Sequence, residues 1–216
     1  EDYAFEGCTS LTQIAIPSSV TSIGYCAFKG CNSLRQLSIP LSVKSIDNLA
    51  FSNCKTLKKL TIPSSVTSIN DKLFDGCRKL MNISVLSFVS SFEDFVFRGC
   101  CSLTKIVVPF SVTSIGDKTF YGCSSLIEIS VPSSLKTIGE CAFKGCSSLK
   151  QFLIPPSLTS IGYYAFDGCS SLTQITIPSS ITSIGDGVFK DCSSLKQIEI
   201  ESSLTTIGDF AFKGCS

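Results

Sequence analysis

One 23-residue unit is repeated nine times without insertion or deletion, and nine residues of a tenth unit follow. Positions that recur every 23 residues are called a column below. One column holds only phenylalanine: Phe5, Phe28, Phe51, Phe74, Phe97, Phe120, Phe143, Phe166, Phe189 and Phe212. Another holds only cysteine: Cys8, Cys31, Cys54, Cys77, Cys100, Cys123, Cys146, Cys169, Cys192 and Cys215. A period this strict indicates a solenoid in which each unit is one coil and like residues stack on like. Specific function can therefore reside only in columns where the units differ.

The composition of the chain excludes several classes of function. Its net charge is +1, whereas nucleic-acid binders usually concentrate a basic excess. It has no His, which removes Ser-His-Asp and Cys-His nucleophile activation and most catalytic zinc sites. No apolar run approaches the ~20 residues of a membrane span. We therefore expect no enzyme, cofactor, metal site, nucleic-acid partner or membrane span in this chain.

Residues 11–33 illustrate the structure expected for one coil. Ile14 and Ile16 alternate with outward residues and end at Pro17, which predicts a short half-buried strand. Since all coils run the same way, these strands should pair in parallel. Residues 20–23 predict a second extended or 3₁₀ piece on the return side. The side chains expected to face inward are Leu11, Ile14, Ile16, Val20, Ile23, Ala27, Phe28 and Cys31.

Two glycine-rich columns predict tight turns, because Gly, Asn and Asp tolerate left-handed backbone. The first begins at Gly24, and the second precedes the cysteine column; we expect positive φ in both. The exceptions in these columns are Asp47, Asn70 and Glu93 in the first, and Asn53 and Asp191 in the second. Between the two columns the pattern predicts a single helical turn with an acidic N-cap in each coil.

Seven acidic residues occupy the column that opens this turn: Asp2, Asp71, Asp94, Asp117, Glu140, Asp186 and Asp209. Closely spaced carboxylate oxygens suit calcium, so a calcium-binding ridge is one interpretation. The other is N-capping with solvation, and we favour it because acidic residues are common N-caps.

The cysteine column predicts a ladder of buried free thiols. Stacking places neighbouring Cα atoms about 5 Å apart, but parallel Cβ vectors match disulfide geometry poorly. A metal site would need clustered Cys-x-x-Cys pairs, which are absent, and free Cys is among the most buried residue types. Cys26, Cys101 and Cys141 lie outside the column, and we expect them to be more accessible.

The unit LxxIxIPxSVxSIGxxAFxGCxS resembles the BspA-like, or Treponema-type, leucine-rich repeat family. Matching stretches are Leu172 to Gly185 and Ala142 to Cys146, and the likeness covers the entire chain. The resemblance implies a β-rich leucine-rich-repeat solenoid, a right-handed α/β-type superhelix with a parallel sheet on its concave face. It also implies mostly surface proteins of anaerobic bacteria and parasitic protists, some of which bind host matrix or plasma proteins. The family carries no catalytic residues that could be transferred.

The outward columns of the first strand vary most between units. They contain six basic and two acidic residues and many Gln, without pocket-forming aromatic residues. We interpret them as a large, flat, mildly positive protein-binding face. Solvated strand residues without a partner explain the same columns equally well. The candidate binding residues are Arg35, Gln36, Lys58, Lys59, Lys105, Glu128, Gln151 and Gln174, together with Phe110 of the neighbouring turn.

The fourth unit departs from the pattern at its strand exit. It carries Leu86-Ser87-Phe88 where other units have Pro-Ser-Ser, and the next unit carries Pro109-Phe110. We expect this turn to lie outside the core and to be otherwise polar, so an exposed apolar patch is expected at Phe110. For Phe88 we expect local repair instead, with the ring tucked inward beside Phe92.

These features predict a non-enzymatic protein-binding module, which the resemblance places in a surface or secreted protein. The alternative is an intracellular scaffold or regulatory subunit in the cytoplasm, which a ladder of reduced Cys favours. The chain starts and stops inside a unit and shows no polar cap. We therefore interpret residues 1–216 as a single continuous array from a longer protein. Without caps, its end coils should associate end to end.

Overall fold

Most coils begin with a short strand because one buried residue alternates with one exposed residue over four positions. In the computed structural model, which describes residues 1–86, 88–201 and 203–215, β3 shows this alternation over Lys59–Ile62. The equivalent strands are β4 Asn82–Val85, β6 Lys105–Val107, β8 Glu128–Ser130, β11 Gln174–Ile177 and β13 Gln197–Ile200. They pair in parallel as β3–β4, β6–β8 and β11–β13, which confirms the predicted direction.

The return side of most coils carries a shorter extended segment of two residues. These strands are β1 Ser22–Ile23, β2 Ser45–Ile46, β5 Ser91–Phe92, β7 Ser114–Ile115, β9 Thr137–Ile138, β10 Ser160–Ile161, β12 Ser183–Ile184 and β14 Thr206–Ile207. They also pair in parallel, and β5, β7, β9 and β10 form one four-stranded ladder. Of the two conformations that the sequence allows here, the return segment is therefore extended.

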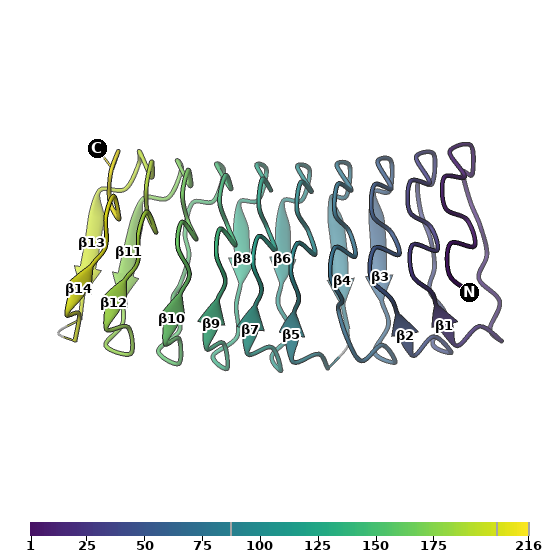
Figure 1. Cartoon of the computed structure of the whole chain (residues 1–216), viewed down its shortest axis with the longest axis horizontal. Coiled ribbons are helices and arrows are strands. Elements are labelled where there is room, and N and C mark those ends of the chain that lie inside the picture. The colour runs from purple at the N-terminus through teal and green to yellow at the C-terminus, as the bar shows by residue number, and fades with distance from the viewer. Residues whose placement is uncertain (87, 202, 216) are drawn as a thin grey trace.

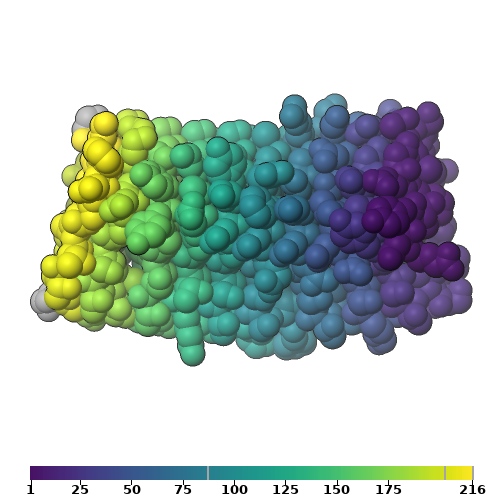
Figure 2. All heavy atoms as spheres, viewed as in Figure 1, coloured from purple at the N-terminus to yellow at the C-terminus, as the bar shows by residue number. Residues whose placement is uncertain are grey.

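The coils follow one another along an elongated rod whose termini lie at opposite ends (Figure 1). In the space-filling view, the colour changes steadily from one end of the rod to the other, so residues close in sequence stay close along the axis (Figure 2). Partners in the ladders are 23 residues apart, as in Ser114 opposite Thr137. Each coil thus contacts mainly the coil before and the coil after it, as in other solenoids.

The core lies between the two ladders and contains the predicted inward set. One central coil shows it completely, because each of its eight inward side chains is at most 1% exposed: Leu57, Leu60, Ile62, Val66, Ile69, Leu73, Phe74 and Cys77. The phenylalanine column forms an unbroken stack from Phe5 to Phe212. Within it, the rings of Phe120 and Phe143 are 5.2 Å apart and 6° from parallel. The predicted ladder of like residues is confirmed.

The predicted helical turn is wrong: the described residues contain no helix. Each coil instead places two residues with positive φ in this segment, such as Cys26 at 54° and Gly30 at 74°. Left-handed residues at this spacing interrupt the run of right-handed φ/ψ values that a helix needs. Isolated turns result, for example one in which Lys29 N–H donates to Cys26 C=O at 3.0 Å. No helix long and apolar enough to cross a membrane occurs in the described part of the chain.

The structure also corrects one glycine column. The column before the cysteines has positive φ as predicted, including its exceptions Asn53 at 57° and Asp191 at 55°. The column of Gly24 does not, and the second left-handed position lies two residues later, at Cys26 and its equivalents. The column of Gly24 holds glycine because a side chain there would collide with the preceding coil. A Cβ on Gly116, for example, would lie 2.5 Å from Asp94 Oδ1. Close approach of stacked coils, not backbone conformation, selects this glycine.

Candidate protein-binding face

The eight strand residues proposed as binding residues all lie exposed on one face of the rod. Alternation places six of them there, because the residue after each, such as Leu60 or Ile129, points into the core. Arg35 and Lys58 come one position earlier and are exposed as well. The ladders bring neighbouring members together: Gln36 lies opposite Lys59, and Lys105 lies opposite Glu128. This surface, called the sheet face below, is therefore continuous from coil to coil.

Charge on the sheet face is unevenly neutralised. Lys105 Nζ lies 2.8 Å from Glu128 Oε1, so these two predicted residues already satisfy each other. Both side chains are more than half exposed, and such surface pairs contribute at most about 1 kcal/mol. Arg35, Lys58 and Lys59 make no salt bridge within the described residues. Lys150 and Lys196 make none there either, so three of the five free positive charges on the sheet face lie near its N-terminal end.

The sheet face is hollowed, so the flat surface expected from the sequence is wrong. Its first four coils line an open hollow of about 960 Å³, bounded by Gln36 and Lys59 near the strand starts and by Leu41 and Leu86 at the strand exits. The hollow forms because one outward strand column carries small side chains in these coils, namely Ala15, Ser38 and Thr61. In later coils the same column carries Val107, which is 59% exposed, and Leu153, which is 80% exposed.

An apolar patch borders this hollow at the strand exits, and it includes both phenylalanines of the irregular turn. Phe88 and Phe110 are 69% and 70% exposed, and their rings meet edge-to-face with centroids 5.3 Å apart. They line a second hollow of about 410 Å³ together with Leu86, which also lines the first. Exposure of Phe110 is confirmed.

The inward tuck expected for Phe88 is wrong. Its neighbour Val89 already fills the inward position, and Phe92 fills the core above it; both are fully buried. In other coils this column holds Ser, whose hydroxyl donates to a carbonyl of the preceding coil, as Ser65 does to Val43 O at 2.6 Å. A phenyl ring cannot donate such a hydrogen bond, so it projects outward. Ser87, between these turn residues, lies outside the described residues.

A column of paired charges was not predicted from the sequence. Arg98 binds Asp75 through two hydrogen bonds of 2.8 and 2.6 Å, and Lys144 Nζ lies 2.9 Å from Asp167 Oδ2. The hydrogen bond from each cation raises its pKa, since the partner carboxylate favours the charged form. The partners are 23 residues apart, and Lys29 contacts Glu6 at the same spacing. Opposite charges at one period could have been recognised in the sequence.

The ring of Phe95 is a second feature that went unrecognised. The cationic groups of Lys72, Arg98 and Lys118 lie 5.3, 5.1 and 5.5 Å from its centroid. Lys72 and Lys118 share its column, one coil before and one coil after. Because the ring face attracts cations, this cluster holds the side chains of three coils together.

The acidic column stabilises the stack between coils instead of capping a helix. Asp94 Oδ1 accepts a hydrogen bond of 2.7 Å from Asp117 N–H, and Asp117 Oδ1 accepts one of the same length from Glu140 N–H. Asp2 and Asp186 bind the next coil in the same way. The carboxylates therefore satisfy backbone donors, which explains the residue type without calcium. Among the described residues, no group of three or more His, Cys, Asp or Glu is placed to hold a metal ion.

The cysteine column forms a ladder of free thiols, and those from Cys31 onward each donate a hydrogen bond to the preceding coil. Cys123 Sγ donates to Phe97 O at 3.1 Å, and the same bond recurs from Cys31 to Cys215. All ten column cysteines and the three others are unpaired with one another. Burial raises the pKa of the Cys77 thiol to about 12 and that of the Cys31 thiol to about 11, because a thiolate is poorly solvated inside the core.

The expected accessibility of the three other cysteines is only partly right. Cys101 is exposed, as predicted, but Cys26 and Cys141 are 1% and 7% exposed. Both occupy the left-handed column at the bend of the turn, where the neighbouring coils cover the side chain. Position outside the cysteine column therefore does not imply access to solvent.

This burial pattern predicts how the thiols react. In native protein, Ellman's reagent should modify Cys8 and Cys101 quickly and the buried ladder slowly, because only an accessible thiolate attacks the reagent. In guanidinium all thirteen thiols should react. Cys101→Ser should remove one rapid equivalent and leave the slow phase unchanged. Rapid modification of Cys123 in the native state, or an intact mass showing several disulfides, would contradict the buried ladder.

The repeat pattern and the fold together identify the family. The model of the BspA type leucine rich repeat region matches six copies in two overlapping stretches, residues 1–127 and 113–216. The chain belongs to this family. Among curated proteins, none matches the chain.

Solved structures of bacterial leucine-rich repeat proteins resemble this BspA-type chain. A leucine rich repeat protein of Treponema pallidum is 28% identical, with a TM-score of 0.60, over 83% of this chain and 76% of that one. A leucine-rich repeat protein of Bacteroides ovatus is 30% identical over 100% of this chain and 79% of that one, with a TM-score of 0.48. A leucine rich cell surface protein of Faecalibacterium prausnitzii is 24% identical over 89% and 80%, with a TM-score of 0.44.

Proposed function

We propose that this chain is a non-enzymatic protein-binding module that holds its partner on the sheet face. The observation that carries the proposal is the continuous exposed surface along the strands, hollowed over the first four coils and rimmed by charge and apolar side chains. A rigid stack that presents variable residues on an invariant core is suited to binding another protein. Residues Gln151 and Gln174 extend this surface into the C-terminal half.

We further propose a surface or secreted location for the protein that carries this array. The support is the family: the resemblance implies mostly surface proteins, some of which bind host matrix or plasma proteins. An intracellular scaffold is the second candidate, since a ladder of reduced thiols fits a reducing compartment. End-to-end association of copies remains a prediction of the sequence; the exposed Ile198 and Ile200 of β13 are compatible with it.

Bulky charge on the sheet face should block capture of a partner, whereas the same charge on the return side should not. Ser130→Arg with Thr176→Arg places two long cations among outward strand residues, and Thr67→Arg with Thr159→Arg is the matched control on exposed return-side positions. Immobilised protein would be exposed to matrix and plasma proteins in one arm and to cell lysate in the other. We expect at least a tenfold loss of captured partner for the sheet-face variant alone.

Two outcomes of this experiment would count against the proposal. Equal loss for both double variants would show that charge or folding, and not the sheet face, determines capture. Loss for the return-side variant alone would place the binding surface on the opposite side. Capture only from matrix and plasma proteins would support the surface location, and capture only from lysate would support the scaffold.

A further inference from the structure

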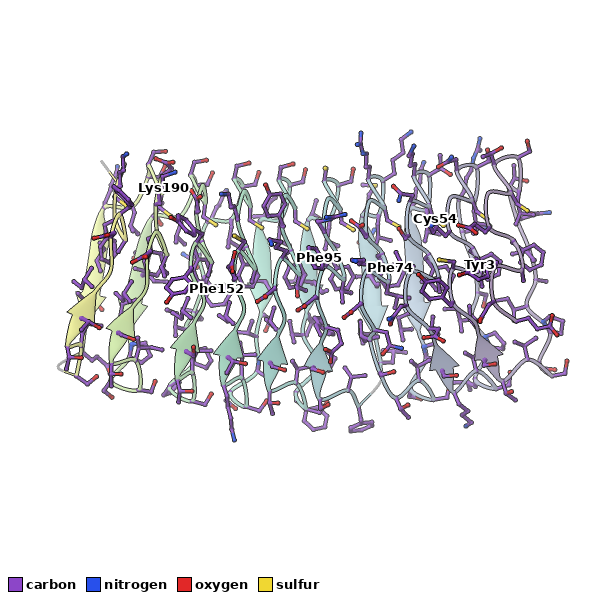
Figure 3. The ribbon with its side chains drawn as sticks, in the orientation of Figure 1. Tyr3, Cys54, Phe74, Phe95, Phe152 and Lys190 are labelled. Atoms are coloured by element: carbon purple, nitrogen blue, oxygen red, sulfur yellow. The ribbon has the colours of Figure 1, made fainter. Side chains whose placement is uncertain are left out.

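A cluster of like charges lies on the second to fourth coils, at the start of their strands. Its members are Arg35, Lys55, Lys58, Lys59, Arg78 and Lys79, all exposed. The segments that carry them, residues 32–36, 55–59 and 78–82, contain no Asp or Glu. Within the described residues, none of the six makes a salt bridge. Figure 3 shows nitrogen-tipped side chains standing out from the upper edge of the rod above β3 and β4.

In the described part of the chain, the stacked charges of this cluster lack the partner groups that stacked charges in other columns have. Elsewhere, many stacked charges have opposite signs, as in Asp75 with Arg98, and the stacked carboxylates of Asp94 and Asp117 each accept a backbone N–H of the next coil. Here Arg35 stacks under Lys58, and Lys55 stacks under Arg78, on coils about 4.8 Å apart. Like charges facing each other on adjacent strands are destabilising. The fold therefore tolerates a repulsion here that an acidic partner would relieve.

The cationic cluster and the apolar patch lie at opposite ends of the same hollow. Lys59 lines it at the strand starts, and Leu41 and Leu86 line it at the strand exits. Four residues of extended chain separate the column of Lys59 from that of Leu86 and five from that of Leu41, or about 13–16 Å at the rise of a strand. Beyond Leu86, the exposed rings of Phe88 and Phe110 continue the apolar end.

We propose that this hollow binds an extended acidic segment of a partner protein, with its carboxylates on the cluster of Arg35, Lys58 and Lys59 and an apolar side chain at Leu86. The proposal rests on the protein-binding function proposed above and specifies the chemistry of the partner. Charge complementarity gives the orientation, and burial of apolar groups at Leu86 and Phe88 adds affinity. A sulfated glycan or a nucleic acid would use the cations but gain little from the aliphatic end.

Synthetic fluorescent peptides test this arrangement by anisotropy. The probe carries a short run of Asp and Glu, a spacer of about five Ser and Gly residues matched to the strand length, and a Leu-Phe pair. One control peptide replaces the acidic residues by Lys, and another replaces Leu-Phe by Ser-Ser. We expect the acidic-apolar probe to bind at least tenfold more tightly than either control, and more weakly as salt increases.

Variants of the protein show which end of the hollow binds the acidic end of the probe and which binds the apolar end. Lys58→Glu with Lys59→Glu should lower affinity for the acidic-apolar probe at least tenfold, and Lys44→Glu with Lys136→Glu is the matched reversal on the return side. Leu86→Ser should lower the affinity for the acidic-apolar probe and leave the affinity for the Ser-Ser control peptide unchanged. Since all these positions are exposed, circular dichroism should show unchanged folding.

Several outcomes would overturn the inference. The acidic-apolar probe could bind no better than the Lys peptide, or bind independently of Lys58 and Lys59. Heparin or single-stranded DNA, tested in parallel, could bind the cluster more tightly than the probe and without any effect of Leu86→Ser. In that case the cluster is a polyanion site. If the probe fails while the sheet-face variant of Ser130 and Thr176 still loses captured partner, only this inference is refuted and the protein-binding function stands.

Discussion

Phe120→Ala is expected to lower the free energy of unfolding by roughly 3–5 kcal/mol, the range for removing a buried aromatic ring. Phe120 is fully buried in the middle of the stack. Its ring lies 5.2 Å from Phe97 on one side and 5.2 Å from Phe143 on the other. Neighbouring coils cannot close the cavity without losing their own register, because the backbone ladders fix the distance between coils.

Phe110→Ala is the matched control for this prediction, since it removes the same atoms from a ring that is 70% exposed. Its effect should stay within about 0.5 kcal/mol, as for most surface substitutions. Urea unfolding of both variants, followed by circular dichroism, gives the comparison. Equal stability of Phe120→Ala and the unchanged protein would mean that the phenylalanine stack does not hold the coils together.

The interior of this fold is predictable from the sequence because each buried column is nearly invariant. Phe, Cys and Leu recur without exception, and a residue that stacks on its own copy must satisfy the same environment in every coil. The alternation of Leu60 and Ile62 with outward residues likewise determines which face of the strand is buried. Both inferences use spacing alone, and both are confirmed.

The turn between the two glycine columns is not predictable in the same way. Glycine serves two different purposes, and the sequence does not distinguish them. Gly30 has positive φ, whereas Gly116 has no room for a side chain beside Asp94. The left-handed position of the first turn is held by unrelated residues such as Lys72 and Phe95, so no composition signal marks it. Backbone hydrogen bonds between coils impose this conformation whatever the side chain.

The candidate site was also only partly predictable from the sequence. Which residues face outward followed from the period, and the exposure of Lys58 and Gln174 agrees with it. The hollow did not follow, because it depends on how far Leu41 and Leu86 project beside small residues such as Ser38. Phe88 shows the limit most clearly: a single coil that departs from the pattern cannot be interpreted from its neighbours.

The thiol ladder predicts that the protein unfolds sharply in alkali. Burial raises the pKa of Cys77 to about 12 and holds the pKa of Cys100, Cys146 and Cys169 well above the ordinary value of 9.0. In the unfolded chain these thiols lose their protons near the ordinary value. Above that pH the folded state binds more protons than the unfolded state, so its stability falls as the pH rises. Below about pH 9 the stabilisation is complete.

The loss should be steep because many thiols act together. Each one lowers the free energy of unfolding by about 1.4 kcal/mol per pH unit once its unfolded form is ionised. Cys123 is also fully buried and its pKa is raised by the same burial, which gives at least five such thiols. Together they remove about 7 kcal/mol per pH unit, which is comparable to the whole stability of a typical domain. We expect cooperative unfolding between about pH 9.5 and 11.

Urea unfolding in reducing buffer at several values from pH 7 to 10 measures this slope, and two cysteine variants isolate the thiols as its cause. Cys123→Ala removes one buried thiol and should make the decline in stability shallower by about 1.4 kcal/mol per pH unit. Cys101→Ala, one residue beyond the column cysteine Cys100, removes an exposed thiol and should leave the slope unchanged. Lys and Tyr also titrate in alkali, but both variants retain all of them. A slope that Cys123→Ala does not alter would show that groups other than the ladder control alkaline unfolding.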